Sequence, residues 1–148
     1  MMKSILVWLL ATAILLSAPA VNAQSAGKIF RIGYLDNSTA PGSAVYVDAL
    51  RQELNKLGWI EGKNIAIEYR FAEQKDGRLP ELAAELVRSK VDLIVIVGYP
   101  AAAAAKQATI VIPIVMANAL DPVGSGLVAS LARPEGNITG LSSLATEL

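Results

Sequence analysis

The stretch VDLIVIVGYPAAAAAKQATIVIP, residues 91–113, decides the fold. Within it, Leu93–Val97 is an unbroken apolar run, mostly β-branched, and a strand that is apolar on both faces must be covered on both faces, as in a parallel sheet flanked by helices. Gly98 and Pro100 break the strand, and the alanines after them have the highest helix propensity of any residue. The stretch therefore predicts a central strand, a tight turn and the start of a helix.

Strand and helix signals alternate along the rest of the chain, and such alternation is typical of an α/β domain with a parallel sheet. The segment Asn64–Tyr69 alternates apolar and polar residues, as a half-exposed edge strand does. In the segment Ile110–Met116, Pro113 indicates that strand pairing begins at or after the proline. Polar connections are expected at Arg70–Gly77 and Ala117–Gly126. Five strands are expected, in chain order Ile29–Leu35, Asn64–Tyr69 (the edge strand), Leu93–Val97, Ile110–Met116 and Ile138–Leu141.

Apolar periodicity predicts further helices between these strands. The first carries an apolar stripe that should face the sheet, and Gly58 should end it. A second helix is expected from about Leu79 to Ser89, with its charged residues on a solvated face, and a short one over Leu127–Leu131. The stripe of the first helix consists of Tyr46, Leu50, Leu54 and Leu57.

The first 23 residues have the pattern of a secretory signal peptide. Lys3 precedes the apolar run Ile5–Leu16, and Val21 and Ala23 are small residues placed before a cut at Gln24. The run is too short to span a bilayer comfortably, which favours a signal peptide over an uncleaved anchor. We expect export to the periplasm, with residues 24–148 forming one lobe. Because the chain contains no cysteine, we expect no lipid anchor, disulfide or Cys-based metal site.

The composition of the chain argues against several classes of function. The chain has 13 basic and 13 acidic residues and only 5% aromatic residues, so it lacks the basic stripe of a nucleic-acid-binding protein. It has no histidine, the commonest general base and metal ligand. We therefore expect no metal, no cofactor and no enzymatic activity.

Three loops follow the carboxyl ends of predicted strands, where open α/β sheets bind ligands. They are Asn37–Ser43, Gly98–Ala101 and Asn118–Asp121. The first offers hydroxyls and an amide, the second backbone N–H groups at a helix start beside an aromatic ring, and the third an amide and a carboxylate. The candidate ligand-binding residues are Asn37, Ser38, Gly98, Tyr99, Ala101, Asn118 and Asp121.

Together these groups suit a small zwitterion. Its carboxylate would lie at the helix N-terminus, its ammonium near Asp121 and its apolar or aromatic body against Tyr99. A structural role is the alternative for Asn37, Ser38 and Asp121, because all three are also good turn and N-cap residues.

Several runs, in this order and spacing, resemble the N-terminal lobe of the ABC-transporter substrate-binding family that includes the tryptophan- and tyrosine-binding lipoproteins. The resemblance covers nearly the whole chain after the signal peptide. It implies a type 1 periplasmic-binding fold, in which two flavodoxin-like lobes close over a ligand, and it implies that the three loops form the N-lobe half of the cleft. The runs are RIGYL (31–35), LRQELNKLGWIEGKNIAIEYR (50–70), RLPELAAELV (78–87), AAKQAT (104–109), IPIV (112–115), DPVGSGLVASLARP (121–134) and GNITGLS (136–142).

The resemblance implies capture of a small solute, such as an amino acid, for an inner-membrane ABC permease. The lipid-modified cysteine of Gram-positive members is missing, which indicates free diffusion in a periplasm. We expect the second lobe to be absent, and an apolar surface around Leu141–Leu148 to favour a homodimer or a partner lobe. Two alternatives are a flavodoxin-type cofactor protein, since residues 38–43 have the hydroxyls and glycine of a flavin phosphate loop, and a truncated product without transport function.

Overall fold

The structure, a computed structural model, describes residues 27–130 and 136–143. In that part of the chain five parallel strands form one sheet in the order β2-β1-β3-β4-β5. This is the flavodoxin-like order, and it confirms the predicted fold class, with the predicted central strand in the middle and the alternating strand at an edge. The strands are β1 (Phe30–Asp36), β2 (Ile65–Phe71), β3 (Leu93–Val97), β4 (Ile114–Leu120) and β5 (Ile138–Ser143).

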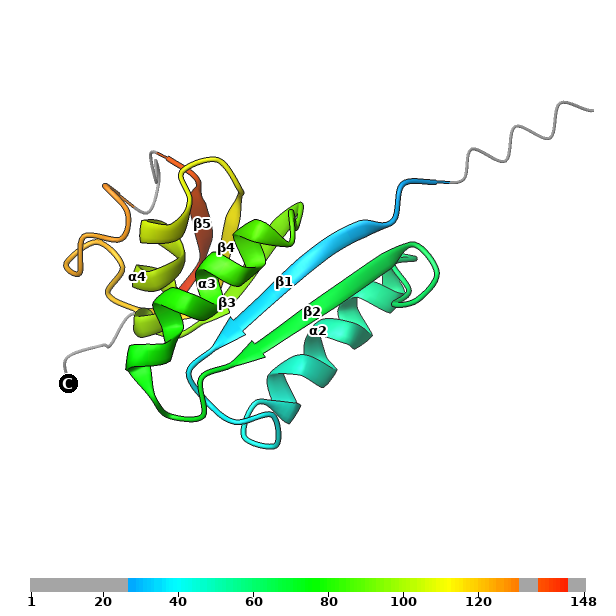
Figure 1. The fold of residues 1–148 in the computed structure, drawn as a ribbon, viewed down its shortest axis with the longest axis horizontal. Helices are drawn as coiled ribbons and strands as arrows, with labels where there is room; N and C mark the ends of the chain where they lie inside the picture. Colours follow the sequence, from blue (N-terminus) through cyan, green and yellow to red (C-terminus); the bar gives the residue numbers. More distant parts are fainter. Residues whose placement is uncertain (1–26, 131–135, 144–148) are drawn as a thin grey trace, which may run out of the picture.

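Helices lie on both faces of the sheet (Figure 1). Helix α2 (Ala44–Lys56) packs on one face, whereas α3 (Leu79–Arg88), which follows the short 3-10 helix η1 (Asp76–Arg78), and α4 (Tyr99–Ala108) pack on the other. The alternating side chains of β3 take part in both cores, because Ile94 and Ile96 pack under α3 and α4 and Val95 packs on the α2 side. The prediction that this strand is covered on both faces is confirmed.

The predicted apolar stripe of the first helix is partly wrong. The side chains of α2 that pack on the sheet are Val47, Leu50 and Leu54. Tyr46 is 47% exposed, and Leu57 lies beyond the end of the helix and is 75% exposed. A stripe that starts at position 47 with spacings of three and four fits the 3.6-residue period as well as the predicted one does, so only packing against the sheet selects between them.

Strand β2 is longer than predicted. Arg70 and Phe71 were assigned to a polar connection, but they continue the ladder with β1, opposite Leu35 and Asp36. Hydrogen bonds to a neighbouring strand hold these residues in the sheet even though the local alternation ends.

Strand β4 begins at Ile114, directly after the proline, as Pro113 indicated. It continues to Leu120, so the assignment of residues 117–120 to a polar loop was wrong. The reason is pairing on both sides: Asn118 lies opposite Val97 of β3, and Ala119 and Leu120 lie opposite Ser142 and Ser143 of β5. A bulge between Met116 and Ala119 accommodates the irregular register.

The predicted short helix over residues 127–131 was also wrong as far as the structure describes it. Residues 121–128 form successive turns, in which the N–H groups of Leu127 and Val128 both donate to the carbonyl of Pro122. Leu127 and Val128 are nonetheless buried in the core, so their apolar side chains anchor a turn and not a helix. Leu131 and the predicted signal peptide lie outside the described residues. No helix in the described ranges is long and apolar enough to cross a membrane.

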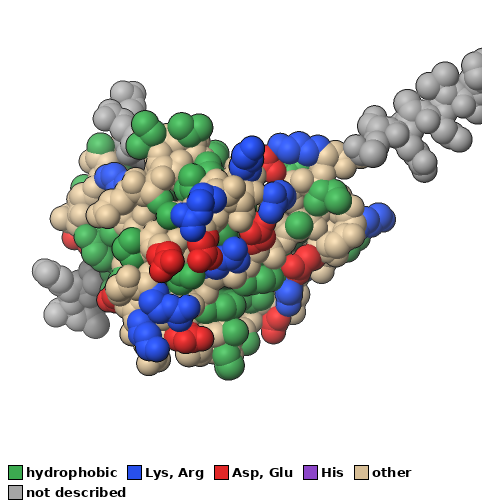
Figure 2. Space-filling view, viewed as in Figure 1, with side chains coloured by type: hydrophobic (Ala, Val, Ile, Leu, Met, Phe, Trp, Pro, Cys, Tyr) green, Lys and Arg blue, Asp and Glu red, His purple; other side chains and the backbone are tan. Residues whose placement is uncertain are grey.

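Charged side chains of both signs are interspersed on the face shown in Figure 2. Charged residues of the described chain form ion pairs, among them the partly buried Arg70 with Glu85 at 2.8 Å and the exposed Arg78 with Glu73 at 3.1 Å. Exposed pairs contribute little to stability, about 0 to 1 kcal/mol each. This face therefore presents no large field of one sign.

Candidate functional site

The predicted loops leave the same edge of the sheet, at neighbouring positions. Asp36 at the end of β1 lies opposite Val97 of β3, and Val97 lies opposite Asn118 of β4. Since β1 connects to β2 on one side and β3 connects to β4 on the other, the strand order reverses between β1 and β3. Asn37 and Gly98 therefore start side by side at the switch point, where ligands bind in open α/β sheets.

The first loop is held by a buried carboxylate that the sequence analysis did not select. Asp36 is 5% exposed, and its Oδ1 accepts a hydrogen bond from the backbone N–H of Ser38 at 2.9 Å. Its Oδ2 accepts from the hydroxyl of Ser43, which is fully buried at the start of α2, and from the hydroxyl of Tyr34 at 3.4 Å. A signal existed in the sequence, since an acidic residue ends an apolar strand and a serine follows seven residues later.

Burial and the neighbouring Asp36 carboxylate both raise the pKa of Tyr34 far above its usual range. The Tyr34 hydroxyl therefore remains a protonated donor toward Asp36. This fixes the polarity of the buried group of hydrogen bonds at the end of β1.

Asn37 and Ser38, two of the predicted ligand residues, are half-buried beside this carboxylate. Their backbone carbonyls accept hydrogen bonds from the turn after β2: Gln74 N–H donates to Asn37 at 2.6 Å and Glu73 N–H donates to Ser38 at 3.1 Å. The side-chain oxygen of Asn37 is buried without a hydrogen-bond partner among the described residues. A buried amide oxygen of this kind usually has a partner, so its hydrogen-bonding capacity is unused in this structure.

The second loop begins α4. Gly98 has φ +82°, and its N–H donates to the carbonyl of Asn118 at 2.8 Å. Ala102 N–H makes the first hydrogen bond of the helix, to Gly98, so the N–H groups of Tyr99 and Ala101 precede the helical ladder. Tyr99 is 45% exposed, whereas Ala101 is fully buried, its backbone included, so Tyr99 presents groups to solvent in this loop and Ala101 does not.

The third predicted segment, Asn118–Asp121, covers the last residues of β4 and the first residue after the strand. Asn118 is an exposed residue of β4 and does not lie in a loop. Asp121 follows the strand with φ +39°, and its carboxylate accepts a hydrogen bond from Gly124 N–H at 2.8 Å. Asp121 therefore has the turn-capping role that the sequence left open, while its exposed carboxylate still supplies negative charge at this edge.

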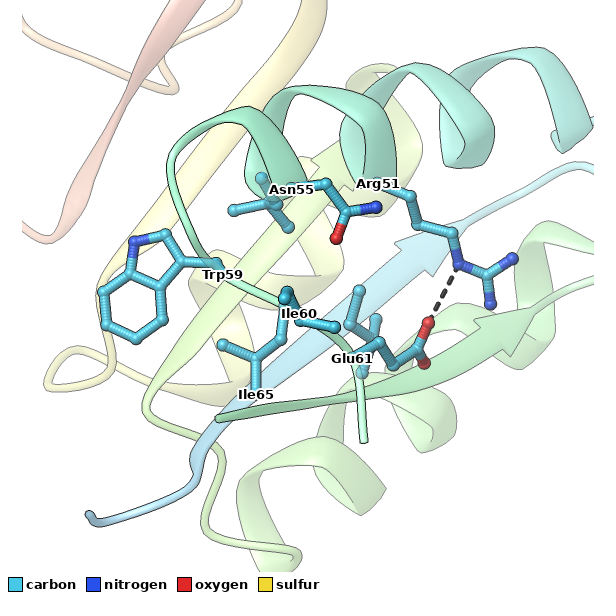
Figure 3. A pocket seen from close by; sticks show the side chains of 8 residues that line it. Arg51, Asn55, Trp59, Ile60, Glu61 and Ile65 are labelled. Atoms are coloured by element: carbon cyan, nitrogen blue, oxygen red, sulfur yellow. Dashed lines mark hydrogen bonds and ion pairs between the residues drawn. The ribbon is translucent and has the colours of Figure 1, made fainter. Parts of the chain in front are cut away.

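Several cavities lie elsewhere on the molecule. One of about 180 Å³ opens between the end of α2 and the start of β2, where Arg51 Nε donates to Glu61 at 2.9 Å and Trp59 lies at the rim (Figure 3). A second, of about 210 Å³, shares Trp59 and is lined mainly by apolar atoms around Phe30. Both lie at the amino ends of the strands.

Two further cavities, of about 240 and 270 Å³, lie beside α2. None of the four is lined by the predicted ligand residues. The predicted ligand residues therefore lie outside these four cavities, and the described residues contain no cluster of three or more acidic side chains that could hold a metal ion.

Comparisons with known proteins agree with this arrangement. The tyrosine-binding protein of Clostridioides difficile (strain R20291) is 40% identical over 89 residues, which cover 60% of this chain and 26% of that protein. The chain thus spans about a quarter of the length of this curated relative.

Solved structures share the fold. A conserved domain protein from Vibrio cholerae O1 biovar El Tor matches with a TM-score of 0.76 and 32% identity, over 80% of this chain and 40% of that one. A ligand-free, open substrate-binding protein with adhesive properties from Clostridium difficile matches with a TM-score of 0.75 and 30% identity, over the same shares. An ABC domain from Streptococcus pneumoniae in complex with L-Trp matches with a TM-score of 0.71 and 29% identity, over 76% of this chain and 38% of that one.

The family model for ABC transporter substrate binding proteins matches residues 38–147, which include all but one of the predicted ligand residues. That family comprises transport proteins that bind substrates, so the match favours this interpretation over a flavin-binding protein. The resemblance drawn from the sequence is confirmed: the chain belongs to the ABC transporter substrate binding protein family.

Proposed function

We propose that this chain supplies one lobe of a solute receptor that delivers an amino acid, or a similar small organic molecule, to an ABC importer. The observation that carries the proposal is the family match, together with the three neighbouring segments at the switch point of the sheet. Capture would proceed by closure around the ligand and not by chemical reaction.

The chemistry of the edge favours a zwitterion with an aromatic body. The N–H group of Tyr99 at the start of α4 would bind its carboxylate, since helix N-termini attract anions. The negative charge of the exposed Asp121 would attract its ammonium group, and the half-exposed Tyr99 would contact its side chain. Relatives described as tyrosine-binding and as bound to L-Trp make these two amino acids the first candidates.

The ligand would be enclosed by a second body. The solved relatives are matched over only 38 to 40% of their length, so their remaining residues can supply the opposite wall of a cleft. Here a second lobe or a second copy of this chain would supply that wall. Leu141 on β5, 74% exposed, belongs to the apolar surface expected to meet it; the rest of that surface lies beyond the residues whose side chains are described.

Export completes the proposal. Residues 1–23 would be removed as a signal peptide, and the chain from Gln24 onward would diffuse in the periplasm and deliver its ligand to the permease. An intact mass that begins at Gln24 in periplasmic material is the expected result. A mass that retains residues 1–23 would contradict export by this route.

Amino acid binding can be tested with an ¹⁵N-labelled chain. L-Trp and L-Tyr should shift the amide signals of Ser38, Gly98 and Tyr99, with a dissociation constant near millimolar, because one lobe supplies roughly half of the −8 kcal/mol of a micromolar complex. N-acetyl-tryptophan amide, which lacks both charges, should give no such shifts. Micromolar binding by a monomer would contradict the proposed half-cleft.

Two tyrosines of nearly equal exposure provide a matched pair. Tyr99 is 45% exposed at the proposed site, and Tyr46 is 47% exposed on α2. Tyr99→Ala should weaken L-Trp binding, whereas Tyr46→Ala should leave it unchanged. Equal effects of the two substitutions would exclude Tyr99 from the site.

A further inference from the structure

The Asp36 carboxylate lies beneath the loop that carries two proposed ligand residues. Its two oxygens hold the two ends of that loop: Oδ1 accepts from Ser38 N–H near the start, and Oδ2 accepts from the Ser43 hydroxyl at the end. Both Asp36 and Ser43 are buried, at 5% and 0% exposure, so water does not compete for these hydrogen bonds. One buried side chain thus joins the end of β1 to the start of α2.

The turn after β2 holds the same loop from the other side. The N–H groups of Ala72, Glu73 and Gln74 donate to the backbone carbonyls of Asp36, Ser38 and Asn37. Glu73 and Gln74 have φ values of 56° and 61°, a left-handed conformation that residues other than glycine adopt rarely. Two such residues in succession persist where surrounding contacts fix them, and backbone strain of this kind clusters at ligand-binding sites.

The loop is also closed tightly over these contacts. Gly42 N–H donates to the Thr39 hydroxyl at 3.1 Å, and a Cβ atom placed on Gly42 would lie 2.4 Å from the Ser38 hydroxyl oxygen. Because the backbone groups of Asn37 and Ser38 are engaged, these residues have few alternative conformations. The backbone of Asn37 and Ser38 is therefore held in place at the switch point.

We propose that Asp36 is the positioning residue of this loop, which it holds in the conformation that binds the ligand. The proposal rests on the proposed function, because it assigns the role of Asp36 within the same site. Preorganisation of this kind raises affinity, since the ligand does not have to order the loop on binding. Asp36 itself is buried beneath the loop and acts through Asn37 and Ser38.

The test compares Asp36→Ala, Asp36→Asn and Ser43→Ala with Asp48→Asn, a control that neutralises an exposed carboxylate on α2. Amide hydrogen exchange at Ser38, Glu73 and Gln74 should become about 10-fold faster in Asp36→Ala, and L-Trp affinity should fall by about 10-fold to 100-fold. Asp36→Asn should retain part of the affinity, because its amide oxygen can still accept from Ser38 N–H. The control should match the unsubstituted chain in both measurements.

Affinities are compared where circular dichroism shows every variant fully folded, so that lost stability alone does not change them. Should Asp36→Ala fail to fold, Ser43→Ala, which removes one hydroxyl, carries the same expectation of faster exchange and weaker binding. Unchanged exchange, or faster exchange with unchanged affinity, would overturn the positioning role while leaving the proposed function in place. If the unsubstituted chain binds neither L-Trp nor L-Tyr, the assignment of an aromatic amino acid to the proposed site is wrong and the positioning role falls with it.

Discussion

The two edges of the sheet differ in what the chain places there. At the carboxyl edge, backbone and side-chain hydrogen bonds converge on Asp36 and Gly98. None of the four cavities described above is lined by the predicted ligand residues. At the amino edge, Trp59 and Phe30 pack edge to face at 5.6 Å, and Trp59 borders two cavities, one with a mixed lining that includes Arg51 and Glu61 and one that is mainly apolar. The two cavities that share Trp59 therefore lie at the end of the sheet opposite to the proposed ligand-binding groups.

This difference has a physical explanation. A single lobe that binds its ligand against a second body needs an open, polar surface with free donors, whereas an apolar cavity at the other end arises where a helix end and a strand start pack imperfectly. Polar groups fix the orientation of a ligand, and they are concentrated at the carboxyl edge. The four cavities described above are thus a poor guide to the proposed ligand site, since no predicted ligand residue lines them.

The largest expected loss of stability comes from a substitution in β3, the central strand of the sheet. Ile96 of β3 is fully buried, so Ile96→Ala should destabilise the protein by about 2 to 5 kcal/mol through lost burial and an unfilled cavity. The control is Ile110→Ala at the amino edge, where the side chain is 86% exposed and the change should stay within about 0.5 kcal/mol. Urea unfolding measures both, and a loss below about 1 kcal/mol for Ile96→Ala would show that β3 does not anchor the sheet.

A smaller effect is expected at the carboxyl edge, where Gly98 has φ +82° and ψ 161°, a conformation almost confined to glycine. An added Cβ would meet only Pro100, at 3.9 Å, so the strain of Gly98→Ala would come from the backbone alone. We expect a loss of about 1 to 3 kcal/mol and weaker L-Trp binding, because the start of α4 would shift.

Gly77→Ala is the matched control for this substitution. Gly77 has open space around its Cβ position and no positive φ, so the change should stay within about 0.5 kcal/mol. Thermal unfolding followed by circular dichroism compares the two variants. If Gly98→Ala and Gly77→Ala were equally stable, a side chain at position 98 would not strain the turn.

The smallest effect tests the amino edge directly. Trp59 is 38% exposed and pairs with Phe30, so Trp59→Ala should cost about 1 kcal/mol of stability. Affinity for L-Tyr should remain that of the unsubstituted chain, because the ring lies at the edge opposite the proposed site. Amide shift titration supplies the measurement, and loss of L-Tyr binding would move the ligand site to the cavities around Trp59.

Local patterns predicted much of this fold. The doubly apolar run of β3, the alternation of Asn64–Tyr69 and the stripe of α3 each depend on neighbouring residues, and all three elements were found where expected. The position of the candidate site at the switch point followed from the strand order alone. The predictions that failed concern the stripe of α2 and residues 70–71, 117–120 and 127–130, where packing or partners distant in sequence decide the structure.

The sequence by itself determined the class of fold and the family, because periodicity, turn residues and the order of its motifs are all properties of the linear chain. Only the tertiary structure decided that β4 runs to Leu120, that Asp121 caps a turn and that Ala101 faces the core. Only the tertiary structure, too, brought Asp36, Ser43 and the turn at Glu73 together beneath one loop. The physical reason is that burial and hydrogen-bond partners depend on segments far apart in the chain, and no local pattern encodes which of them will meet.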